Sequence, residues 1–289
     1  MENKERNVSV NGVLYLVATP VGNLEDITLR ALKVLREVDI IAAEDTRQTI
    51  KLLNSYEIKK PLVSYFEHNK RVKGGYLIRQ LLSGKNIALV SDAGTPGISD
   101  PGEELVKQAV DSGIRVTLVP GPAAAVMGLV LSGLPAGRFV FEGFLPMNKR
   151  SRKERAASLK SETRTIVLYE APHKLIYTLK DLYEALGDRK MAICRELTKK
   201  FEEITRCTIS EAISKYGNDP PRGEFVLVIE GADEGRLRTE AAEAWSEMDI
   251  KEHVELYIGQ GMEKKEAIKK VSLDRGVSKR EIYNRLLGK

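Results

Sequence analysis

Residues Val13–Asn23 read VLYLVATPVGN, an apolar, β-rich run that ends in a loop of proline and glycine. The run has the length and composition of a buried strand, and proline and glycine end it just after Ala18. The same unit, a short apolar run followed by a loop, recurs through the first half of the chain. Strands are therefore expected at Val13–Ala18, Ile40–Ala43, Leu62–Tyr65, Ile87–Ser91 and Arg115–Val119.

Helical patterns alternate with these strands. Such alternation implies right-handed crossovers and a mainly parallel sheet that helices cover on both faces. The sequence thus predicts a first α/β domain over residues 12–136, after a polar N-terminus, residues 1–11, that is expected to be disordered. The expected helices are Asp26–Val38, Thr46–Tyr56, Lys70–Ser83 and Gly102–Ser112.

A second set of strands follows, with tighter spacing, which favours antiparallel pairs and a mixed sheet. We place this second α/β domain at residues 137–234, with the boundary in the segment Leu134–Gly137. Its expected strands are Phe139–Glu142, Ile166–Tyr169, Met191–Arg195, Ile204–Thr208 and Phe225–Ile229, and its expected helices are Lys174–Leu186 and Ser210–Tyr216.

The C-terminal region, residues 235–289, shows only helical patterns. Its last part, Lys264–Lys289, has nine basic and three acidic residues. Ser278 and Glu281 match a capping box that opens a helix to Leu287. A helix, a glycine-containing turn and a capped basic helix are the outline of a helix-turn-helix. A solvated helical hairpin that packs on the body fits the pattern equally well.

The bulk properties exclude several classes of protein. Two cysteines and three histidines offer no spaced metal site, so no metal is expected. The uncharged stretch Val116–Pro135 is broken by Pro120–Pro122, which favours a buried strand and helix over a membrane span. We therefore expect a cytoplasmic protein with no membrane association. The formal net charge of +5 is by itself weak support for an anionic partner.

Three loops follow first-domain strands directly: Thr19–Asn23, Ser91–Gly102 and Pro120–Ala125. In an open parallel sheet, ligands bind in the crevice beyond the carboxyl ends of the strands. One such loop can be a simple tight turn, but three on one rim favour a binding site. The chain has no glycine motif for a dinucleotide or a P-loop, and these loops contain no lysine or arginine. A ligand with adenosine and amino acid groups but no phosphate fits this composition best.

Seven longer motifs resemble those of the tetrapyrrole methylase superfamily and, within it, the ribosomal RNA small-subunit methyltransferase I family. The resemblance runs from about Gly12 to Glu230, and a basic helical tail is also found in that family. The motifs are Leu16–Leu24, Ala43–Arg47, Ser91–Gly102, Val119–Pro122, Tyr169–His173, Arg195–Glu203 and Gly223–Ile229.

The resemblance implies a two-domain tetrapyrrole-methylase-like α/β fold with S-adenosylmethionine in the interdomain cleft, and a homodimer. It implies 2′-O-methylation of a cytidine in the decoding region of 16S rRNA, so the partner is 16S rRNA or the small ribosomal subunit. Many superfamily members have serine or threonine where this chain has Ala123–Ala125, so backbone groups must make the hydrogen bonds to the cofactor there. Carried over by position, the cofactor contacts are Pro20, Asp92, Gly94, Thr95, Ile98, Ala123, Ala124 and Tyr169.

A sulfonium methyl group is already electrophilic, so catalysis rests on placing the 2′-oxygen in line and on a base that accepts its proton. The expected catalytic residues are Glu170, Lys199, Glu196 and His173, with Glu44, Asp45 and Arg47 as further cleft candidates. Structural roles compete: Glu170 can pair with Arg195, His173 can lie in a helix cap, and Lys199 can hold phosphate. Which of them is the base stays open at this point.

RNA contact requires positive charge, and Lys149–Arg155 has five basic residues in seven. A solvated helix start is the competing interpretation. The expected RNA-binding residues are Arg47, Lys149, Arg150, Arg152, Lys153, Lys200, Lys279 and Arg280. Two other functions remain as alternatives: a methyltransferase of the same superfamily acting on a tetrapyrrole precursor, and a nucleic-acid-binding regulator with a metabolite-sensing body.

Overall fold

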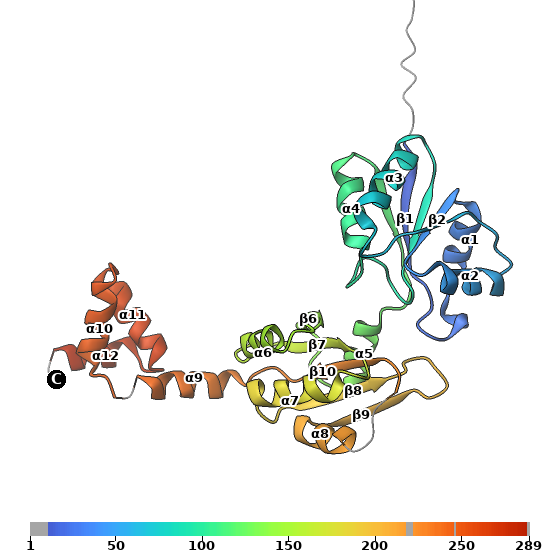
Figure 1. Cartoon of the computed structure of the whole chain (residues 1–289). Coiled ribbons are helices and arrows are strands. Elements are labelled where there is room, and N and C mark those ends of the chain that lie inside the picture. Colours follow the sequence, from blue (N-terminus) through green and yellow to red (C-terminus); the bar gives the residue numbers. More distant parts are fainter. Residues whose placement is uncertain (1–10, 218–221, 246, 288–289) are drawn as a thin grey trace, which may run out of the picture.

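The computed structural model describes residues 11–217, 222–245 and 247–287. It contains two α/β domains and a tail of helices that extends away from them (Figure 1). The expected two-domain tetrapyrrole-methylase-like fold class, with a parallel first sheet, a mixed second sheet and a helical tail, is confirmed.

The first domain is a five-stranded parallel sheet with strand order β3-β2-β4-β1-β5. Helices α1 and α2 pack on one face and α3 and α4 on the other, and each face has its own apolar core. The strands are β1 (Val13–Val17), β2 (Ile40–Ala43), β3 (Leu62–Ser64), β4 (Ile87–Val90) and β5 (Arg115–Val119). The helices are η1 (Leu24–Asp26), α1 (Leu29–Glu37), α2 (Thr46–Ser55), α3 (Lys70–Leu82) and α4 (Gly102–Asp111).

The helix expected at Asp26–Val38 is two elements, because two side chains cap two separate helix starts. Asn23 Oδ1 accepts the Glu25 amide at 3.1 Å and starts the short η1 turn. Thr28 Oγ1 accepts the Ala31 amide at 3.1 Å and starts α1. The break between them keeps the loop after β1 short and defined.

The second domain is a mixed sheet with strand order β6-β7-β10-β8-β9, in which only β6 and β7 run parallel. Helices α6, α7 and α8 cover one face over a large apolar core. The strands are β6 (Phe139–Phe144), β7 (Thr165–Glu170), β8 (Lys190–Arg195), β9 (Glu203–Thr208) and β10 (Phe225–Ile229). The helices are α6 (Lys149–Ser158), α7 (Leu175–Leu186) and α8 (Ile209–Gly217).

Helix α5 (Ala124–Ser132) covers the other face of this second sheet, although it precedes the boundary expected at Leu134–Gly137. A Cβ placed on Gly128 would lie 2.7 Å from Val226 Cγ1, so glycine lets the helix approach β10 closely. By packing, α5 therefore belongs with the second domain, and the chain passes between domains near Pro122.

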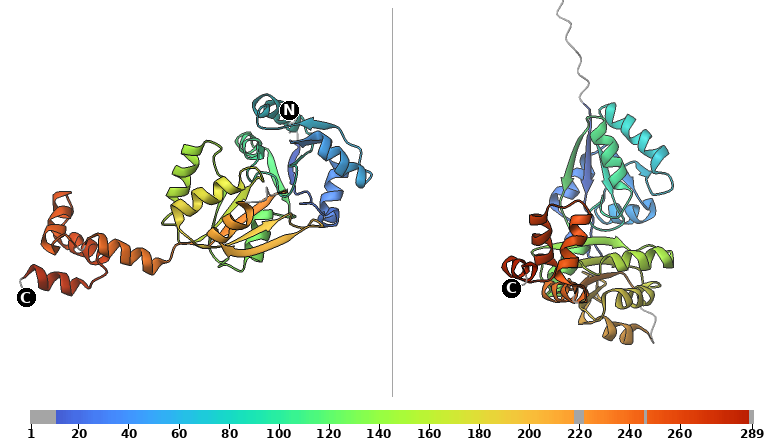
Figure 2. Two further views of the ribbon diagram at one scale, coloured as in Figure 1. Left: turned by 60° about the horizontal axis from the view of Figure 1, so that its bottom comes forward. Right: turned by 90° about the vertical axis from the view of Figure 1, so that its left-hand side faces the viewer.

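The tail consists of α9 (Glu234–Ala244), α10 (Ile250–Gly259), α11 (Lys264–Asp274) and α12 (Lys279–Leu286). Helices α10–α12 bury their own apolar cluster, which includes Val254, Ile268 and Ile282. Ser278 Oγ accepts the Glu281 amide at 3.2 Å, so the expected N-terminal cap of the last helix is present. Figure 1 and the left view of Figure 2 show this unit lying away from both sheets, with α9 as the connection. Among the described residues, helices α10–α12 therefore pack on one another and not on the body.

Within the described ranges, no helix is long and apolar enough to cross a membrane. The uncharged stretch that raised this question is divided among β5, a loop and α5.

Candidate active site

The site lies at the topological switch point of the parallel sheet. Strands β1 and β4 are neighbours, and their onward connections run to opposite sides of the sheet, which leaves a crevice between the loops that follow them. Two backbone hydrogen bonds join these loops, from Thr19 N to Gly94 O at 2.9 Å and from Gly94 N to Thr19 O at 3.0 Å. Gly94 has a φ of +79°, a conformation that favours glycine.

The loop after β4 is held by one carboxylate. Asp100 accepts hydrogen bonds from the amides of Gly97, Ile98 and Gly102, the closest at 2.7 Å. Thr95 Oγ1 donates to Pro122 O at 3.0 Å and so ties this loop to the one after β5. The three expected loops therefore form one connected rim whose shape is fixed in advance.

The second domain closes the rim from the other side. The Tyr169 hydroxyl accepts the Ala125 amide at 3.1 Å, at the first turn of α5. Burial raises the pKa of Tyr169, so the phenol stays neutral. The helix starts after Ala123, so Pro122 lies just outside it, and the Pro122 carbonyl accepts the Thr95 hydroxyl.

These elements enclose a cavity of about 510 Å³ between the two domains. Pockets of this size accommodate ligands such as nucleosides and their conjugates. Of the eight residues expected to contact a cofactor, seven line it; Pro20 is buried beside the cavity, and its neighbour Val21 takes the place at the wall. The seven are Asp92, Gly94, Thr95, Ile98, Ala123, Ala124 and Tyr169.

The cavity is strongly acidic. Its wall includes five carboxylates, those of Glu44, Asp92, Asp100, Glu170 and Glu224, whereas Lys199 is the only lysine or arginine among its lining residues. A multiply charged phosphate would be repelled here. A ligand with a sulfonium and an ammonium group, as S-adenosylmethionine has, matches the wall in charge.

Glu44 is the lining carboxylate with a raised pKa. Burial raises it first, and the negative charges of Asp92 and Asp100 raise it further. Glu44 comes directly after β2, next to Asp45, whose side chain caps α2 and pairs with Arg47 at 2.8 Å. Of the two acidic residues after β2, Asp45 thus caps helix α2, while Glu44 faces the cavity.

Glu170 is held by structural contacts. Only 2% of the residue is exposed. One carboxylate oxygen accepts the Ala171 amide at 2.8 Å and the other accepts the Thr178 hydroxyl at 2.5 Å, with Lys174 Nζ at 3.4 Å. These contacts fasten the end of β7 to the start of α7. The competing pairing with Arg195 does not occur, because Arg195 donates to Arg222 O and Glu203.

Lys199 and Glu196 form a cluster at the edge of the cavity. Lys199 Nζ lies 3.0 Å from both Glu196 Oε1 and Glu224 Oε2. Although burial lowers the pKa of Lys199, the two carboxylates outweigh it and the pKa is raised. Lys199 is therefore a cation and cannot accept a proton. Glu196 does not line the cavity itself.

The loop between β8 and β9 also bridges the domains, which sequence patterns did not show. Thr198 Oγ1 donates to Val21 O at 2.6 Å, and a Cβ on Gly22 would lie 2.3 Å from Lys199 Cγ. Glu196 and Thr198 both have positive φ, of +50° and +66°, which is unusual for residues with side chains. Such strain often marks a functional loop, and here it coincides with the interdomain contact.

His173 lies at the mouth of the cavity. It is exposed, and its imidazole makes no hydrogen bond or ion pair within the described part of the chain. Of the four expected catalytic side chains, it is the one that existing contacts leave available.

The basic segment of α6 is mostly engaged in ion pairs. Arg152 is buried against Asp181, with Nε 2.7 Å from Oδ2. Arg150 pairs with Glu154 and Lys153 with Glu184 on the surface. Arg152 therefore stabilises the second domain and is not available to RNA in this conformation, contrary to the expectation from its spacing. The remaining expected RNA contacts, Arg47, Lys149, Lys200, Lys279 and Arg280, are exposed.

Among the described residues, no group of three or more histidine, cysteine, aspartate or glutamate side chains could hold a metal ion. The fold and the acidic interdomain cavity define a class of two-domain α/β proteins whose small-ligand site lies between the domains. The sequence model of Tetrapyrrole (Corrin/Porphyrin) Methylases matches residues 13–213. Solved structures agree in fold: diphthine synthase (TM-score 0.60, 15% identity, 76% of this chain and 90% of that one) is one. Uroporphyrin-III C-methyltransferase from Thermus thermophilus complexed with S-adenyl homocysteine (TM-score 0.53, 20% identity, 76% and 97%) is another.

Closer relatives refine the assignment. The chain is 54% identical over 273 residues to ribosomal RNA small subunit methyltransferase I of Bacillus subtilis, covering 94% of this chain and 93% of the relative. It is 50% identical over 222 residues to the protein of the same name from Thermotoga maritima, covering 77% of this chain and 100% of the relative. The chain belongs to the tetrapyrrole methylase family and, within it, to the ribosomal RNA small subunit methyltransferase I family. That assignment confirms the expected family and the expected cofactor, S-adenosylmethionine.

Proposed function

We propose that the protein transfers a methyl group from S-adenosylmethionine to the 2′-oxygen of a cytidine ribose in the decoding region of 16S rRNA. The observation that carries the proposal is the acidic, phosphate-excluding cavity between the domains, together with relatives named for rRNA methylation. The cofactor supplies an electrophilic methyl group. The chain's part is to bind both molecules, orient the ribose and accept a proton.

The cofactor would be held largely by backbone groups of the three loops. Gly94 and Ala123–Ala124 present amides and carbonyls without bulky side chains, and Asp92 supplies a carboxylate for an ammonium or hydroxyl group. Tyr169 holds the α5 end of the wall through its bond to Ala125. Because these loops are already bonded to one another, little ordering is needed on binding.

We propose His173 as the group that accepts the 2′-hydroxyl proton. Its imidazole is at the cavity mouth and free of other contacts, whereas Glu170 and Lys199 are committed to hydrogen bonds. Glu44, across the cavity, is the competing acceptor, because its raised pKa makes it a stronger base than an ordinary carboxylate. A general base contributes about 10²–10⁴-fold to rate. Single-turnover rates of His173→Ala and Glu44→Gln separate the two, and equal wild-type rates in both would exclude a base at either position.

RNA would approach over exposed basic side chains on both sides of the cleft and on the tail. Arg47 is 86% exposed beside the cavity, although it also pairs with Asp45. Lys149 and Lys200 lie on the second domain, and Lys279 and Arg280 begin the last helix of the tail. Such contacts fix the position of an RNA and do not read its sequence.

The decisive experiment uses labelled S-adenosylmethionine and small ribosomal subunits from cells that lack the modification. Label in one cytidine ribose of the decoding region supports the proposal. Label in another nucleotide, or transfer only to a tetrapyrrole precursor, would contradict it. Removal of residues 235–289 is expected to weaken subunit binding but keep methyl transfer. The relative from Thermotoga maritima aligns over its whole length with only 222 residues of this chain.

We also propose that the protein works in the cytoplasm as a homodimer. Helix α5 has an outward face on which Val126 and Val130 are 50% and 68% exposed, and Leu29 at the start of α1 is 86% exposed. Exposed apolar side chains that gather on one face often mark a protein–protein interface. Sedimentation of the wild type and of Val130→Asp tests the dimer: a monomeric wild type would exclude it.

A further inference from the structure

A second cavity lies at the end of the second sheet opposite to the cofactor cleft. It has a volume of about 840 Å³. Thr165, the first residue of β7, lines it, whereas Tyr169 and Glu170 at the other end of β7 line the cofactor cavity. The two cavities are therefore separated by the length of the central strands, about 15–20 Å for strands of this size.

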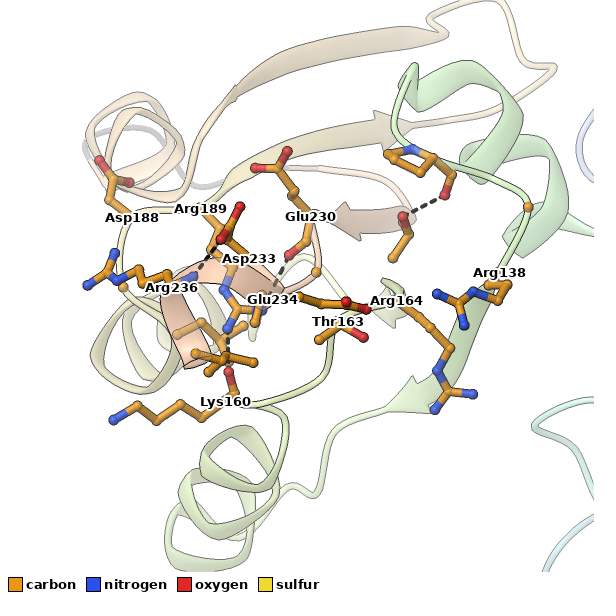
Figure 3. A pocket seen from close by; sticks show the side chains of 18 residues that line it. Arg138, Lys160, Thr163, Arg164, Asp188, Arg189, Glu230, Asp233, Glu234 and Arg236 are labelled. Atoms are coloured by element: carbon orange, nitrogen blue, oxygen red, sulfur yellow. Dashed lines mark hydrogen bonds between the residues drawn. The ribbon is translucent and has the colours of Figure 1, made fainter. Parts of the chain in front are cut away.

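The cavity lies where the tail leaves the body. Gly231 packs so tightly on the preceding loop that a Cβ there would lie 2.0 Å from Thr163 O. The Ala232 amide also donates to Glu162 O at 2.6 Å. These contacts fix the departure point of α9, so that one wall of the cavity is the start of the connection to the basic tail (Figure 3).

A partly buried arginine forms part of the wall. Arg189 donates to Lys160 O at 2.6 Å and to Glu230 O at 3.4 Å, both of which are backbone carbonyls. Burial lowers the pKa of Arg189 first, and the nearby charge of Arg236 lowers it further, against the opposing charge of Glu230. The guanidinium remains charged, so it is a desolvated cation that an incoming anion would stabilise.

Further cations line the open part of the cavity. Arg138 and Lys160 are exposed, and in the described part of the chain their charged groups make no ion pair. Arg164, which Figure 3 shows close to Arg138, already binds Glu162 at 2.7 and 2.8 Å. Figure 3 shows Arg138 and Arg164 at the end of the cavity away from Asp188.

The acidic residues of the wall are largely engaged. Asp188 accepts the Ser210 amide and hydroxyl at 2.8 and 2.7 Å, and Asp233 accepts the Arg236 amide as the cap of α9. Glu230 and Glu234 also line the wall. In Figure 3 the Glu230 carboxylate lies on the opposite side of the cavity from the Lys160 ammonium group. Figure 3 shows Lys160 and Arg138 on different sides of the cavity, so these two exposed cations are dispersed along its wall.

We propose that Arg138 and Lys160, exposed cavity cations that make no ion pair among the described residues, bind the phosphodiester backbone of the RNA substrate, as a contact between the body and the basic tail. The inference rests on the proposed function. It differs from the sequence-based expectation, because Arg152 of the α6 segment binds Asp181 inside the domain, whereas Arg138 and Lys160 make no ion pair within the described ranges. An open cavity with dispersed cations suits an extended polyanion better than a single small phosphate, which needs convergent donors.

The test compares two double variants of the full chain. Arg138→Ala/Lys160→Ala removes the two cations of the cavity. Lys107→Ala/Arg115→Ala is the matched control, since both residues are exposed cations of the first domain without an ion pair in the described structure. The affinity for a fluorescent decoding-region RNA is measured between about 0.05 and 0.5 M salt, and cofactor affinity and the single-turnover methylation rate at saturating RNA are measured in parallel.

Loss of two phosphate contacts is expected to make the slope of log K against log salt shallower by about 1.4–1.8. At 0.1 M salt, binding is expected to weaken on the order of tenfold, with cofactor affinity and the rate at saturating RNA unchanged. The control is expected to keep the wild-type slope.

An unchanged slope in the cavity variant, with a wild type that methylates rRNA, would overturn the inference and leave the proposed function intact. Equal slope changes in both variants would also overturn it, because general charge would then be the cause. A wild type that neither binds nor methylates rRNA overturns the proposed function itself. Displacement of the RNA by millimolar cytidine monophosphate, lost in the cavity variant, would assign the cavity to a small nucleotide instead.

Discussion

Replacing Arg152 with alanine separates a structural role from RNA contact. Arg152 Nε lies 2.7 Å from Asp181 Oδ2, and the two side chains are only 9% and 7% exposed. Nη1 also donates to Met147 O at 3.1 Å. Truncation would leave the Asp181 carboxylate buried without its counter-ion. Breaking a buried pair in this way costs about 3–5 kcal/mol of the free energy of unfolding.

Urea denaturation followed by far-UV circular dichroism measures that loss. With an m-value of about 1–3 kcal/mol/M, the midpoint of the second-domain transition should fall by roughly 2 M. The double variant Arg152→Met/Asp181→Leu is the control. It replaces the pair with apolar side chains of similar size, and should recover most of the lost stability because no charge is left unpaired.

RNA affinity of the same variants decides between the two roles. The double variant is expected to bind rRNA with the wild-type salt slope, since the buried guanidinium makes no contact with phosphate. A normal urea midpoint for Arg152→Ala combined with a shallower salt slope would refute this reasoning. It would show that Arg152 leaves Asp181 and reaches the RNA, as its place in a basic segment suggests.

Two further predictions concern the tail and the packing of α5 on the second sheet. Burial, and then the charge of Arg275, lower the pKa of His253. The neutral imidazole therefore stabilises the tail above pH 6.5, the ordinary pKa of histidine, and this stability is lost as the pH falls below 6.5. Trp245, the only tryptophan, stacks on this imidazole with the ring centroids 3.9 Å apart. Its fluorescence should therefore report opening of the tail between about pH 6.5 and 5. A signal that stays constant over that range would contradict the stabilising role of neutral His253. Gly128→Ala should cost about 1–3 kcal/mol in urea denaturation, because the new Cβ overlaps Val226, whereas Gly75→Ala, also within a helix, meets only the end of a flexible side chain at 3.6 Å. Equal stability of the two variants would show that α5 does not pack on β10 as described.

Much of the site was predictable because its elements are local. The loops after β1, β4 and β5 are recognised from proline and glycine at strand ends, and parallel strands bring such loops to one edge. Of the seven cofactor residues implied by the family resemblance that line the cavity, six lie in these loops, and Tyr169 lies on β7. What short-range patterns could not supply are contacts between distant segments, such as the bond from Thr198 to Val21, 177 residues away in sequence.

The same distinction between local patterns and long-range contacts explains which cationic side chains are free to bind RNA. Sequence shows that Arg152 and Arg138 are both cations, but only the fold places Asp181 beside the first and leaves the second at an open cavity. The order of apolar runs and turns by itself determined the strands, the helices and the rim of loops, since each depends on residues a few positions apart. The tertiary structure alone decided the partner of each charge, the closing of the cleft by the 196–202 loop and the departure point of the tail. Those features depend on groups brought together by packing, whose separation in sequence carries no pattern.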